Sequence, residues 1–284
     1  MTQSFPMNQP PSPGLYIVAT PIGNLGDLTV RAADLLRAAD LVLAEDKRVS
    51  SRLLAHIGAK VPMRTYNDHS DTADREAIVG RLASEVVALV SDAGTPLISD
   101  PGYKLVRDAR TAGHNIVTLP GPCAAVAAMT VAGLPTDRFL FLGFLPPKEK
   151  ARADTIAEVA AIRATLVFYE SGPRLTASLT SLAAGLGERE AAVARELTKM
   201  HEECVTGTLG ELAARYADAP LRGEIVIVVG PPAEATAASE GDLDAALHAA
   251  LAAGESPSRA AAAVAQELGV RRKRAYERAL ELSR

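Results

Sequence analysis

The sequence predicts an α/β protein made of two α/β domains followed by a small helical domain. Its 284 residues, of which 48% are hydrophobic, are enough for two domains of roughly 100–200 residues each. Over residues 14–230, short apolar runs alternate with segments of helical apolar spacing, whereas residues 242–284 show helical spacing alone. Strands that alternate with helices indicate a mainly parallel sheet with helices on both faces.

The first α/β domain is expected over residues 14–135, after a disordered, Pro-rich tail at residues 1–13. Its first apolar run, Leu15–Thr20, is stopped by Pro21 and Gly23 and is typical of a buried strand. The elements predicted after it are a helix at Asp27–Ala38, a strand at Leu41–Ala44, helices at Asp46–Ile57 and Asp71–Leu82, a strand at Val86–Ser91, a helix at Tyr103–Thr111 and a strand at Asn115–Leu119.

The second α/β domain is expected over residues 136–230. Its predicted elements are strands at Arg138–Leu142, Thr165–Tyr169, Ala191–Arg195 and Glu224–Val229, and helices at Ala151–Ile162 and Pro173–Leu186. A linker is expected at residues 231–241, and residues 242–284 are predicted to form a domain similar to a helix-turn-helix. Its helices are expected at Asp242–Ala252, Ser256–Leu268 and Arg271–Leu282, the second with a Ser-Pro start.

Composition and missing motifs exclude several classes of protein. A net charge of −4 disfavours a protein that coats nucleic acid, although a local basic patch stays compatible with it. Cys123 and Cys204 lack CxxC spacing, so we expect no zinc site and no disulfide, and sparse thiols are typical of a reducing cytosol. No apolar run approaches the roughly 18 residues that span a bilayer. We therefore expect a soluble cytoplasmic protein without a metal or a membrane partner.

Common nucleotide and protease motifs are also missing. No GxGxxG follows a predicted strand and no GxxxxGK[ST] occurs, which disfavours dinucleotide and NTP chemistry. His201-Glu202 resembles the start of HExxH, but Val205 stands where the second histidine is required.

Three turn-rich loops each follow a predicted strand of the first domain: Ala19–Asp27, Ser91–Gly102 and Leu119–Ala125. In open α/β sheets, ligands bind in the crevice at the carboxyl ends of the strands. Within the second loop, Gly94 allows a ligand to approach the backbone closely. The three loops together predict a ligand site at one edge of the first sheet.

These loops, in this order and spacing, resemble those of the tetrapyrrole methylase superfamily of S-adenosylmethionine (SAM)-dependent methyltransferases. The resemblance spans Gly14–Val229, and its further motifs are Ala44–Arg48, Phe168–Arg174, Arg195–Glu203 and Gly223–Ile227. Lys47 departs from the expected Thr but leaves the acidic pair before it and Arg48 intact. The resemblance implies the class III methyltransferase fold, SAM in the cleft between two α/β domains, and a homodimer.

The resemblance is closer to the members that modify ribosomal RNA. It implies 2′-O-methylation of a cytidine ribose in 16S ribosomal RNA near the decoding centre, with the 30S subunit as partner and no DNA. Two alternatives stay open: a tetrapyrrole-type methylase of a small substrate, and a non-enzymatic nucleic-acid-binding protein. The Glu45–Arg48 motif and a basic tail favour RNA.

The resemblance also implies the site residues. Expected SAM contacts, mostly through the backbone, are Ile22, Asp92, Gly94, Thr95, Ile98, Cys123, Ala124, Tyr169, Ala194, Arg195, Ile225 and Val226. Candidate bases or orienting groups are Asp92, Glu170, Glu196 and Glu203, with Lys199 as a partner. Each of these carboxylates could equally be a solvated loop charge or part of an ion pair, and the identity of the base stays open.

Basic residues supply the candidate RNA contacts, since lysine and arginine hold phosphates. The expected set is Arg48, Arg52, Lys148, Arg271, Arg272, Lys273 and Arg274, and Arg152 follows the same Pro-Pro loop as Lys148.

Overall fold

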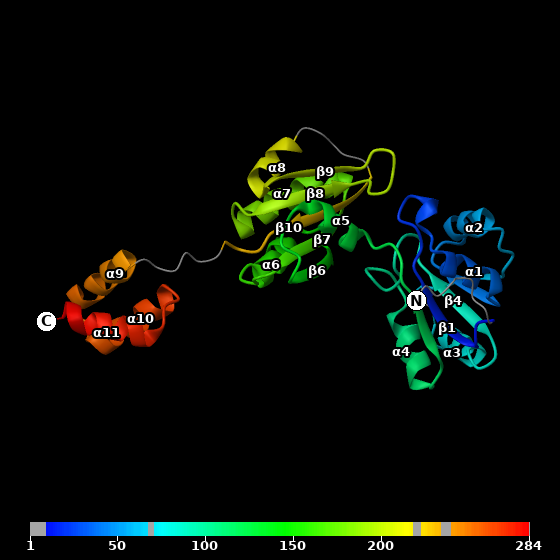
Figure 1. Cartoon of the computed structure of the whole chain (residues 1–284), viewed down its shortest axis with the longest axis horizontal. Coiled ribbons are helices and arrows are strands. Elements are labelled where there is room, and N and C mark those ends of the chain that lie inside the picture. Colours follow the sequence, from blue (N-terminus) through cyan, green and yellow to red (C-terminus); the bar gives the residue numbers. More distant parts are fainter. Residues whose placement is uncertain (1–9, 68–70, 218–222, 234–239, 284) are drawn as a thin grey trace, which may run out of the picture. The chain divides into compact units, whose positions relative to one another are not determined.

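The computed structural model describes residues 10–67, 71–217, 223–233 and 240–283 (Figure 1). The chain divides into two compact units, Met1–Pro231 and Pro232–Arg284. The disordered tail predicted at residues 1–13 lies mostly outside the described residues, and residues 10–13 lead into the first strand without regular structure. No helix in the described ranges is long and apolar enough to cross a membrane.

The first sheet has five parallel strands in the order β3-β2-β4-β1-β5. The strands are β1 Gly14–Val18, β2 Leu41–Ala44, β3 Met63–Thr65, β4 Val86–Val90 and β5 Ile116–Leu119. Every residue of β1, β2 and β4 is buried, because helices cover both faces of the sheet.

Helices α1 Val30–Ala38 and α2 Lys47–His56 pack on one face of this sheet, and α3 Thr72–Arg81 and α4 Tyr103–Thr111 pack on the other (Figure 1). The side chains of Thr29, Asp46 and Asp71 cap α1, α2 and α3 by accepting a backbone N–H of the first turn. The helix predicted from Asp27 is divided: a 3-10 turn, Leu25–Asp27, comes first, and α1 starts after Thr29.

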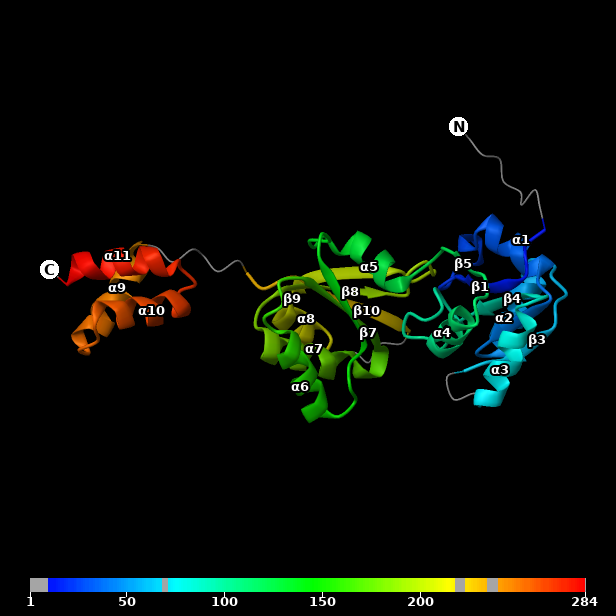
Figure 2. The same ribbon diagram turned by 90° about the horizontal axis from the view of Figure 1, so that it is seen from below.

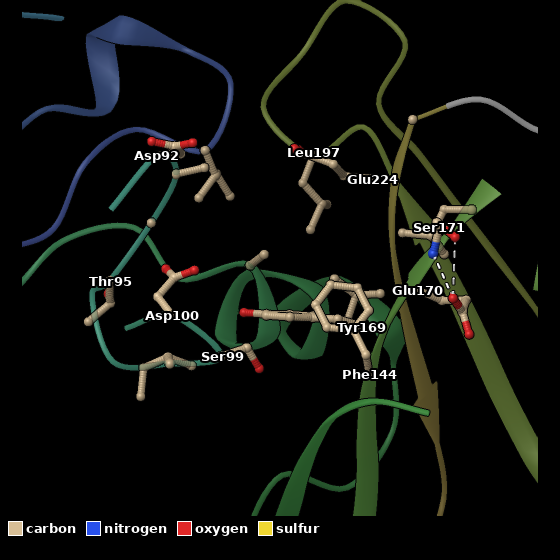
Figure 3. Close-up of a pocket in the computed structure, with 18 residues that line it drawn as sticks. Asp92, Thr95, Ser99, Asp100, Phe144, Tyr169, Glu170, Ser171, Leu197 and Glu224 are labelled. Carbon is tan, nitrogen blue, oxygen red and sulfur yellow. Dashed lines mark hydrogen bonds between the residues drawn. The ribbon is translucent and has the colours of Figure 1, made fainter. Parts of the chain in front are cut away.

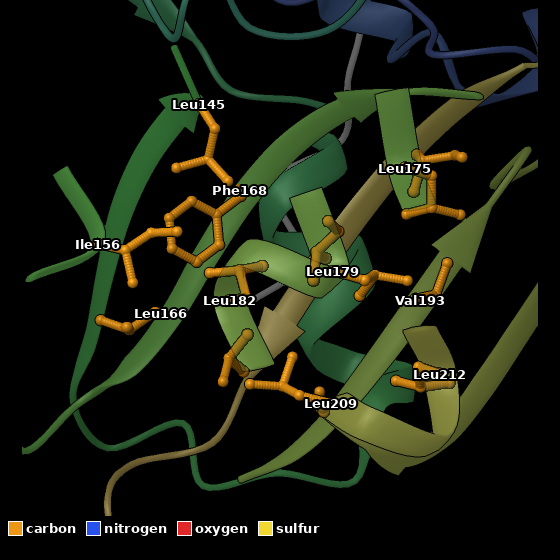
Figure 4. Close-up of a cluster of buried hydrophobic side chains, with 14 of the residues drawn as sticks. Leu145, Ile156, Leu166, Phe168, Leu175, Leu179, Leu182, Val193, Leu209 and Leu212 are labelled. Atoms are coloured by element: carbon orange, nitrogen blue, oxygen red, sulfur yellow. The ribbon is translucent and has the colours of Figure 1, made fainter. Parts of the chain in front are cut away.

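The second sheet is mixed, in the order β6-β7-β10-β8-β9, with β6 parallel to β7 and the other pairs antiparallel. Its elements are β6 Phe139–Phe144, α6 Glu149–Val159, β7 Thr165–Ser171, a 3-10 turn at Gly172–Arg174, α7 Leu175–Leu186, β8 Glu190–Arg195, β9 Glu203–Thr208, α8 Leu209–Arg215 and β10 Glu224–Val229. Helices α6, α7 and α8 cover one face around Phe168, Leu179 and Leu182 (Figure 4), and α5 Ala124–Ala132 covers the other (Figure 2).

The C-terminal unit consists of α9 Glu240–Ala252, α10 Pro257–Glu267 and α11 Arg272–Leu282. Its core is built largely from alanines of α10 and α11 that pack on two leucines of α9. Arg278 donates from Nε and Nη2 to the carboxylate of Asp244, at 2.6 and 2.7 Å, and so ties α11 to α9.

The predicted fold class is confirmed: the first domain has a parallel sheet covered on both faces, a second α/β domain follows, and the tail is helical. Four elements were not predicted, namely β3, α5, β9 and α8. The linker predicted to reach residue 241 is too long, because α9 already begins at Glu240; residues 234–239 lie outside the described ranges.

Candidate functional site

A cavity of about 380 Å³ lies between the two α/β domains, which together provide its wall (Figure 3). The first domain contributes residues 92–95 and 98–100 together with Ile22. The second sheet and its surroundings contribute residues 169–171 and 223–226 with Ala124, Phe144 and Leu197. The wall is mainly apolar with a few polar groups, as is usual for small-molecule sites.

The cavity lies at the carboxyl ends of β1 and β4, where the strand order of the first sheet reverses. The chain after β1 leads to α1 on one face, and the chain after β4 leads to α4 on the other. Such a switch point opens a crevice between neighbouring strands. The predicted loop after β4, Ser91–Gly102, forms the near wall and is called the cavity loop below.

Short contacts hold the cavity loop against the loops after β1 and β5. Thr20 and Gly94 exchange two backbone hydrogen bonds of 2.8 and 3.1 Å, and Thr95 Oγ1 donates to the carbonyl oxygen of Pro122 at 2.9 Å. Gly94 has φ +83°, and a Cβ added there would lie 3.2 Å from Cγ2 of Ile22. Glycine therefore meets both the backbone conformation and the close packing required at this position.

Two non-glycine residues of the cavity loop, Leu97 and Ser99, have left-handed φ values of 72° and 63°. Such conformations cost about 1–3 kcal/mol each and persist only where surrounding contacts impose them. One such contact comes from the second domain, because a Cβ added at Gly143 would lie 2.9 Å from Oγ of Ser99. Gly143 itself has φ +64° and sits at a register shift in β6.

Aromatic rings form the far wall of the cavity. Phe141 and Phe144 both pack edge-to-face on Tyr169, with ring centroids 4.8 and 5.7 Å apart. The Tyr169 hydroxyl accepts from the backbone N–H of Ala125 at 3.3 Å, and burial raises the pKa of Tyr169. Phe144 remains 55% exposed although it lines the cavity, so its ring is available to a ligand.

Two acidic residues of the cavity loop, Asp92 and Asp100, line the cavity (Figure 3). Oδ1 of Asp92 accepts the backbone N–H of Asp46 at 3.0 Å, which joins the cavity loop to the loop after β2. Burial raises the pKa of Asp100 to about 6, and the negative charges of Glu45 and Asp92 act in the same direction. Glu45 is exposed and outside the cavity lining.

Glu170 was a predicted catalytic candidate, but its carboxylate turns away from the cavity (Figure 3). It accepts the backbone N–H of Ser171 at 2.8 Å and the hydroxyl of Ser178 at 2.5 Å, and Nε of Arg174 lies 3.4 Å away. The side chain is fully buried. These contacts anchor the start of α7 and occupy the Glu170 carboxylate, and the catalytic role expected of Glu170 stays a prediction.

The other predicted catalytic residues of the second domain, Glu196, Lys199 and Glu203, do not line the cavity. Nζ of Lys199 lies 2.9 Å from Oε1 of Glu196 and 3.0 Å from Oε2 of Glu224, and this ion pairing lowers the pKa of Glu196. Glu203 pairs with Arg195 at 3.0 Å across β8 and β9. All three are therefore engaged in ion pairs beside the cavity, not in it.

Residues 196–202 form a loop, called the margin loop below, that touches the first domain. A Cβ added at Gly23 would lie 2.5 Å from Cγ of Lys199, so the lysine stem packs directly on the loop after β1. Glu196 and Thr198 have left-handed φ values of 51° and 66°. The margin loop sends Leu197 into the cavity lining and leaves Met200 93% exposed.

Most of the expected SAM contacts do meet in the cavity. Those in its lining are Ile22, Asp92, Gly94, Thr95, Ile98, Ala124, Tyr169, Ile225 and Val226. Three do not line it: Cys123 stands at the N-cap position of α5 with its Sγ 4.0 Å from the Tyr169 hydroxyl, Ala194 is fully buried under α5, and Arg195 pairs with Glu203.

Sequence reasoning missed three notable lining residues, Asp100, Phe144 and Leu197. Asp100 could have been found, because it lies within the cavity loop that the sequence singles out. No local sequence pattern marks Phe144 or Leu197 as a site residue, since they line the cavity only because one domain packs on the other.

The candidate RNA contacts are exposed at Arg48, Arg52 and Lys148, and Arg48 pairs with Asp46 at 2.6 Å. The expectation that Arg152 contacts RNA is wrong. Its side chain is 8% exposed and donates to Oγ of Ser181 and to the carbonyl oxygen of Pro147, so Arg152 is a packing residue. In the C-terminal unit the exposed basic residues at the start of α11 are Arg271, Arg272, Lys273 and Arg274, next to a hollow lined by Ser258, Arg272, Lys273 and Tyr276.

Comparison with known proteins identifies the family. The profile of the Tetrapyrrole (Corrin/Porphyrin) Methylases matches residues 14–213, and that of the RsmI C-terminal HTH domain matches residues 237–283. Proteins named ribosomal RNA small subunit methyltransferase I are similar in sequence. The one from Erythrobacter litoralis (strain HTCC2594) is 54% identical over 96% of this chain and 97% of its own length, and the one from Escherichia coli O157:H7 is 47% identical over 94% of each.

Among solved structures, a diphthine synthase has a similar fold, with a TM-score of 0.60 at 16% identity over 76% of this chain and 89% of its own. The family profile covers the first α/β domain and the second as far as residue 213, and it includes every segment of the cavity wall except residues 223–226. The chain belongs to the tetrapyrrole methylase family, and its cavity lies between the two domains that define that fold.

Proposed function

We propose that the protein is a SAM-dependent methyltransferase that 2′-O-methylates the ribose of a cytidine in 16S ribosomal RNA near the decoding centre. The observation that carries the proposal is the similarity, at 47–54% identity over more than nine-tenths of the chain, to proteins named ribosomal RNA small subunit methyltransferase I. The match includes both the methylase domains and the helical unit. We further propose a cytoplasmic homodimer that acts on the 30S subunit.

The cavity fits SAM in size and chemistry. Its volume of about 380 Å³ falls in the range of small-molecule sites, about 300–1,000 Å³. Apolar side chains such as Ile22, Ile225 and Val226 suit an adenosine moiety, and Gly94 allows close approach to the backbone. Asp92 and Asp100 place negative charge where a cationic sulfonium would be stabilised.

The residues of the cavity would act mainly by positioning. The sulfonium of bound SAM supplies an activated methyl group. The cavity loop and the aromatic wall fix the direction from which a hydroxyl can approach, and holding two reactants in line can supply about 7–11 kcal/mol of the barrier. The site needs no further cofactor for this displacement.

RNA binding is assigned to local basic surfaces, because the chain as a whole carries a net charge of −4. Arg48 and Arg52 on α2 and Lys148 before α6 supply such a surface in the methylase unit. The start of α11, Arg271–Arg274, supplies a second. These cations would contact phosphates and make binding dependent on salt.

The test uses 30S subunits from cells that lack this methyltransferase. The purified full-length protein and SAM carrying a labelled methyl group are added, and the 16S RNA is digested and analysed by mass spectrometry. We expect label in one 2′-O-methylcytidine. Transfer to a tetrapyrrole but not to 30S subunits would favour the small-molecule alternative, and calorimetry without SAM binding would contradict a methyltransferase altogether.

A further inference from the structure

The cavity has a buried apolar part and an exposed part. Ile22, Ile225 and Val226 line it with less than one-tenth of each residue exposed, so a ligand among them is shielded from water. Ile98 and Phe144 line it as well, but each is more than one-third exposed. The buried part suits a cofactor, whereas an acceptor that arrives from solvent on a large particle meets the exposed part first.

Phe144 presents an aromatic ring at the exposed part. Among the residues that the structure describes, the other aromatic side chain in the lining is that of Tyr169. The two rings meet edge-to-face, with centroids 5.7 Å apart and an interplanar angle of 65°. This contact uses only part of the Phe144 ring, and 55% of the residue stays exposed. The ring is therefore supported by a neighbour and still offers surface to a ligand.

The backbone on either side of Phe144 fixes the ring in this place. Gly143, directly before it, has a left-handed φ and lies at the register shift of β6, where the irregular strand redirects the next side chain. Leu145, directly after it, is buried, and its carbonyl oxygen accepts from Nη2 of Arg174. Residues 146 and 147 are both proline, which restricts the chain further. A ring held in this way loses little conformational freedom when a ligand binds.

An exposed aromatic ring followed by a cation is a combination that suits unpaired RNA. Unpaired bases stack on aromatic side chains, and basic side chains hold the phosphates between them. Lys148 is exposed and precedes the first residue of α6, in the same short connection that begins at Phe144. Phe139, also on β6, is 49% exposed but lies outside the lining, and an isolated exposed apolar residue of that kind requires no ligand.

We propose that Phe144 binds the acceptor: its ring stacks on the base of the nucleotide whose ribose is methylated. The proposal rests on the proposed function and requires that this nucleotide be unpaired when it enters the cavity. Stacking holds the base at the exposed part, and the attached ribose then directs its 2′-hydroxyl toward a methyl donor in the buried part. Because every base has a π-face, the ring orients the nucleotide without selecting cytidine.

The experiment compares the full-length protein with Phe144→Ala, Phe144→Leu and Phe144→Trp on 30S subunits from methyltransferase-deficient cells. We expect kcat/KM for 30S subunits to fall by about 5–150-fold in F144A and in F144L, the range that loss of one stacked base gives. F144W should stay within about threefold of the unmodified protein, because tryptophan also stacks on bases. The SAM dissociation constant from calorimetry should change by less than about threefold in all three variants.

Phe139→Ala is the matched control, because it removes a ring of similar exposure from the same strand at a position outside the cavity lining. Its kcat/KM for 30S subunits should stay within about twofold of the unmodified value. Both alanine variants should unfold cooperatively in urea, which shows that each is folded before its rate is compared.

Three results overturn the proposal. An F144L protein that keeps its kcat/KM shows that apolar bulk, and not stacking, is what the position supplies. A SAM affinity that falls in F144A by as much as kcat/KM places the ring against the cofactor. An F139A protein as impaired as F144A makes the effect a general one of β6. An unmodified protein that leaves 30S subunits unmethylated contradicts the proposed function itself.

Discussion

The cavity loop and the margin loop both contain strained, left-handed backbone, but the strain positions different kinds of residue. In the described part of the chain, the non-glycine residues with left-handed φ are Leu97 and Ser99 in the former and Glu196 and Thr198 in the latter. In the cavity loop the strained pair precedes Asp100, whose carboxylate pairs with no cation among the residues that the structure describes. In the margin loop it precedes Lys199, which two carboxylates hold.

The difference shows that strain alone does not mark a reactive group. Strained backbone persists where neighbouring contacts impose it, and those contacts decide what the strain achieves. Ser99 is braced by Gly143 so that Asp100 meets the ligand space, whereas Lys199 packs on Gly23 and closes the contact between the two α/β domains. The cavity loop places a carboxylate in the cavity, and the margin loop holds the two α/β domains together beside it.

The largest expected effect is on SAM affinity, in a comparison of two glycines that share backbone strain but differ in how closely they are packed. Gly94→Ala and Gly58→Ala both place a side chain at left-handed φ, which costs roughly 1–2 kcal/mol of unfolding free energy. Only at Gly94 would the new Cβ meet another residue, Ile22, whereas Gly58 has open space. Calorimetry should show SAM affinity reduced by about 30-fold in G94A and unchanged in G58A. Equal SAM affinities in the two variants would show that the cavity loop does not contact SAM.

The next comparison uses one substitution in each loop that relieves the backbone strain. Ser99→Gly and Thr198→Gly both suit left-handed φ, so their unfolding free energies should change by no more than about 1 kcal/mol. Because Ser99 fixes the neighbouring Asp100, we expect S99G to lower kcat by about tenfold. T198G should keep kcat, since Thr198 precedes a side chain held by ion pairs. Similar rates in both glycine variants would show that the strain in the cavity loop does not position Asp100.

Stability against pH gives a third, smaller effect. The folded-state pKa of Asp100 lies above its ordinary value, so the native state loses stability as pH rises through the interval up to about 6. D100N avoids this loss, and urea unfolding at pH 7 should find it more stable than the unmodified protein by about 1 kcal/mol, with the two alike near pH 4. Equal stability at pH 7 would contradict the desolvation of Asp100.

The smallest effect concerns the margin loop. Lys199→Ala removes the ion pairs to Glu196 and Glu224, and the latter side chain is 71% exposed. Exposed pairs contribute about 0.2–1 kcal/mol, so the unfolding free energy should fall by that amount while kcat stays within about twofold. Steady-state kinetics check this. A loss of kcat of more than about tenfold would place Lys199 in the reaction.

The sequence predicted the region of the site better than its individual side chains. The three loops follow parallel strands, and the carboxyl ends of such strands meet at one edge, so their convergence follows from strand order. Which side chain faces the cavity depends on the face of the strand to which each residue points. Tyr169 and Glu170 were both expected in the site and both line the cavity, but successive residues of β7 point to opposite faces, so the Tyr169 ring points toward the cavity and the Glu170 carboxylate turns away from it.

The missed elements have physical reasons too. Strand β3 has three residues and α8 has seven, which is too short for a clear apolar period. Strand β9, Glu203–Thr208, lies at the sheet edge, and half of its six residues are polar. The Ala-rich α5 lies before the boundary expected at residue 135 yet packs on the second sheet, a contact that no local pattern reports.

The register shift at Gly143 has a consequence for how such cavities diversify. Phe141 and Phe144 are three positions apart, a spacing that places residues of a regular strand on opposite faces, yet both contact Tyr169. One additional residue in β6 has thus recruited a second aromatic ring. Insertion or deletion of a single codon at this strand would change the number of rings that a substrate meets without altering any residue at the opposite wall. The number of rings at this wall therefore depends on the length of β6 as well as on which residues the strand carries.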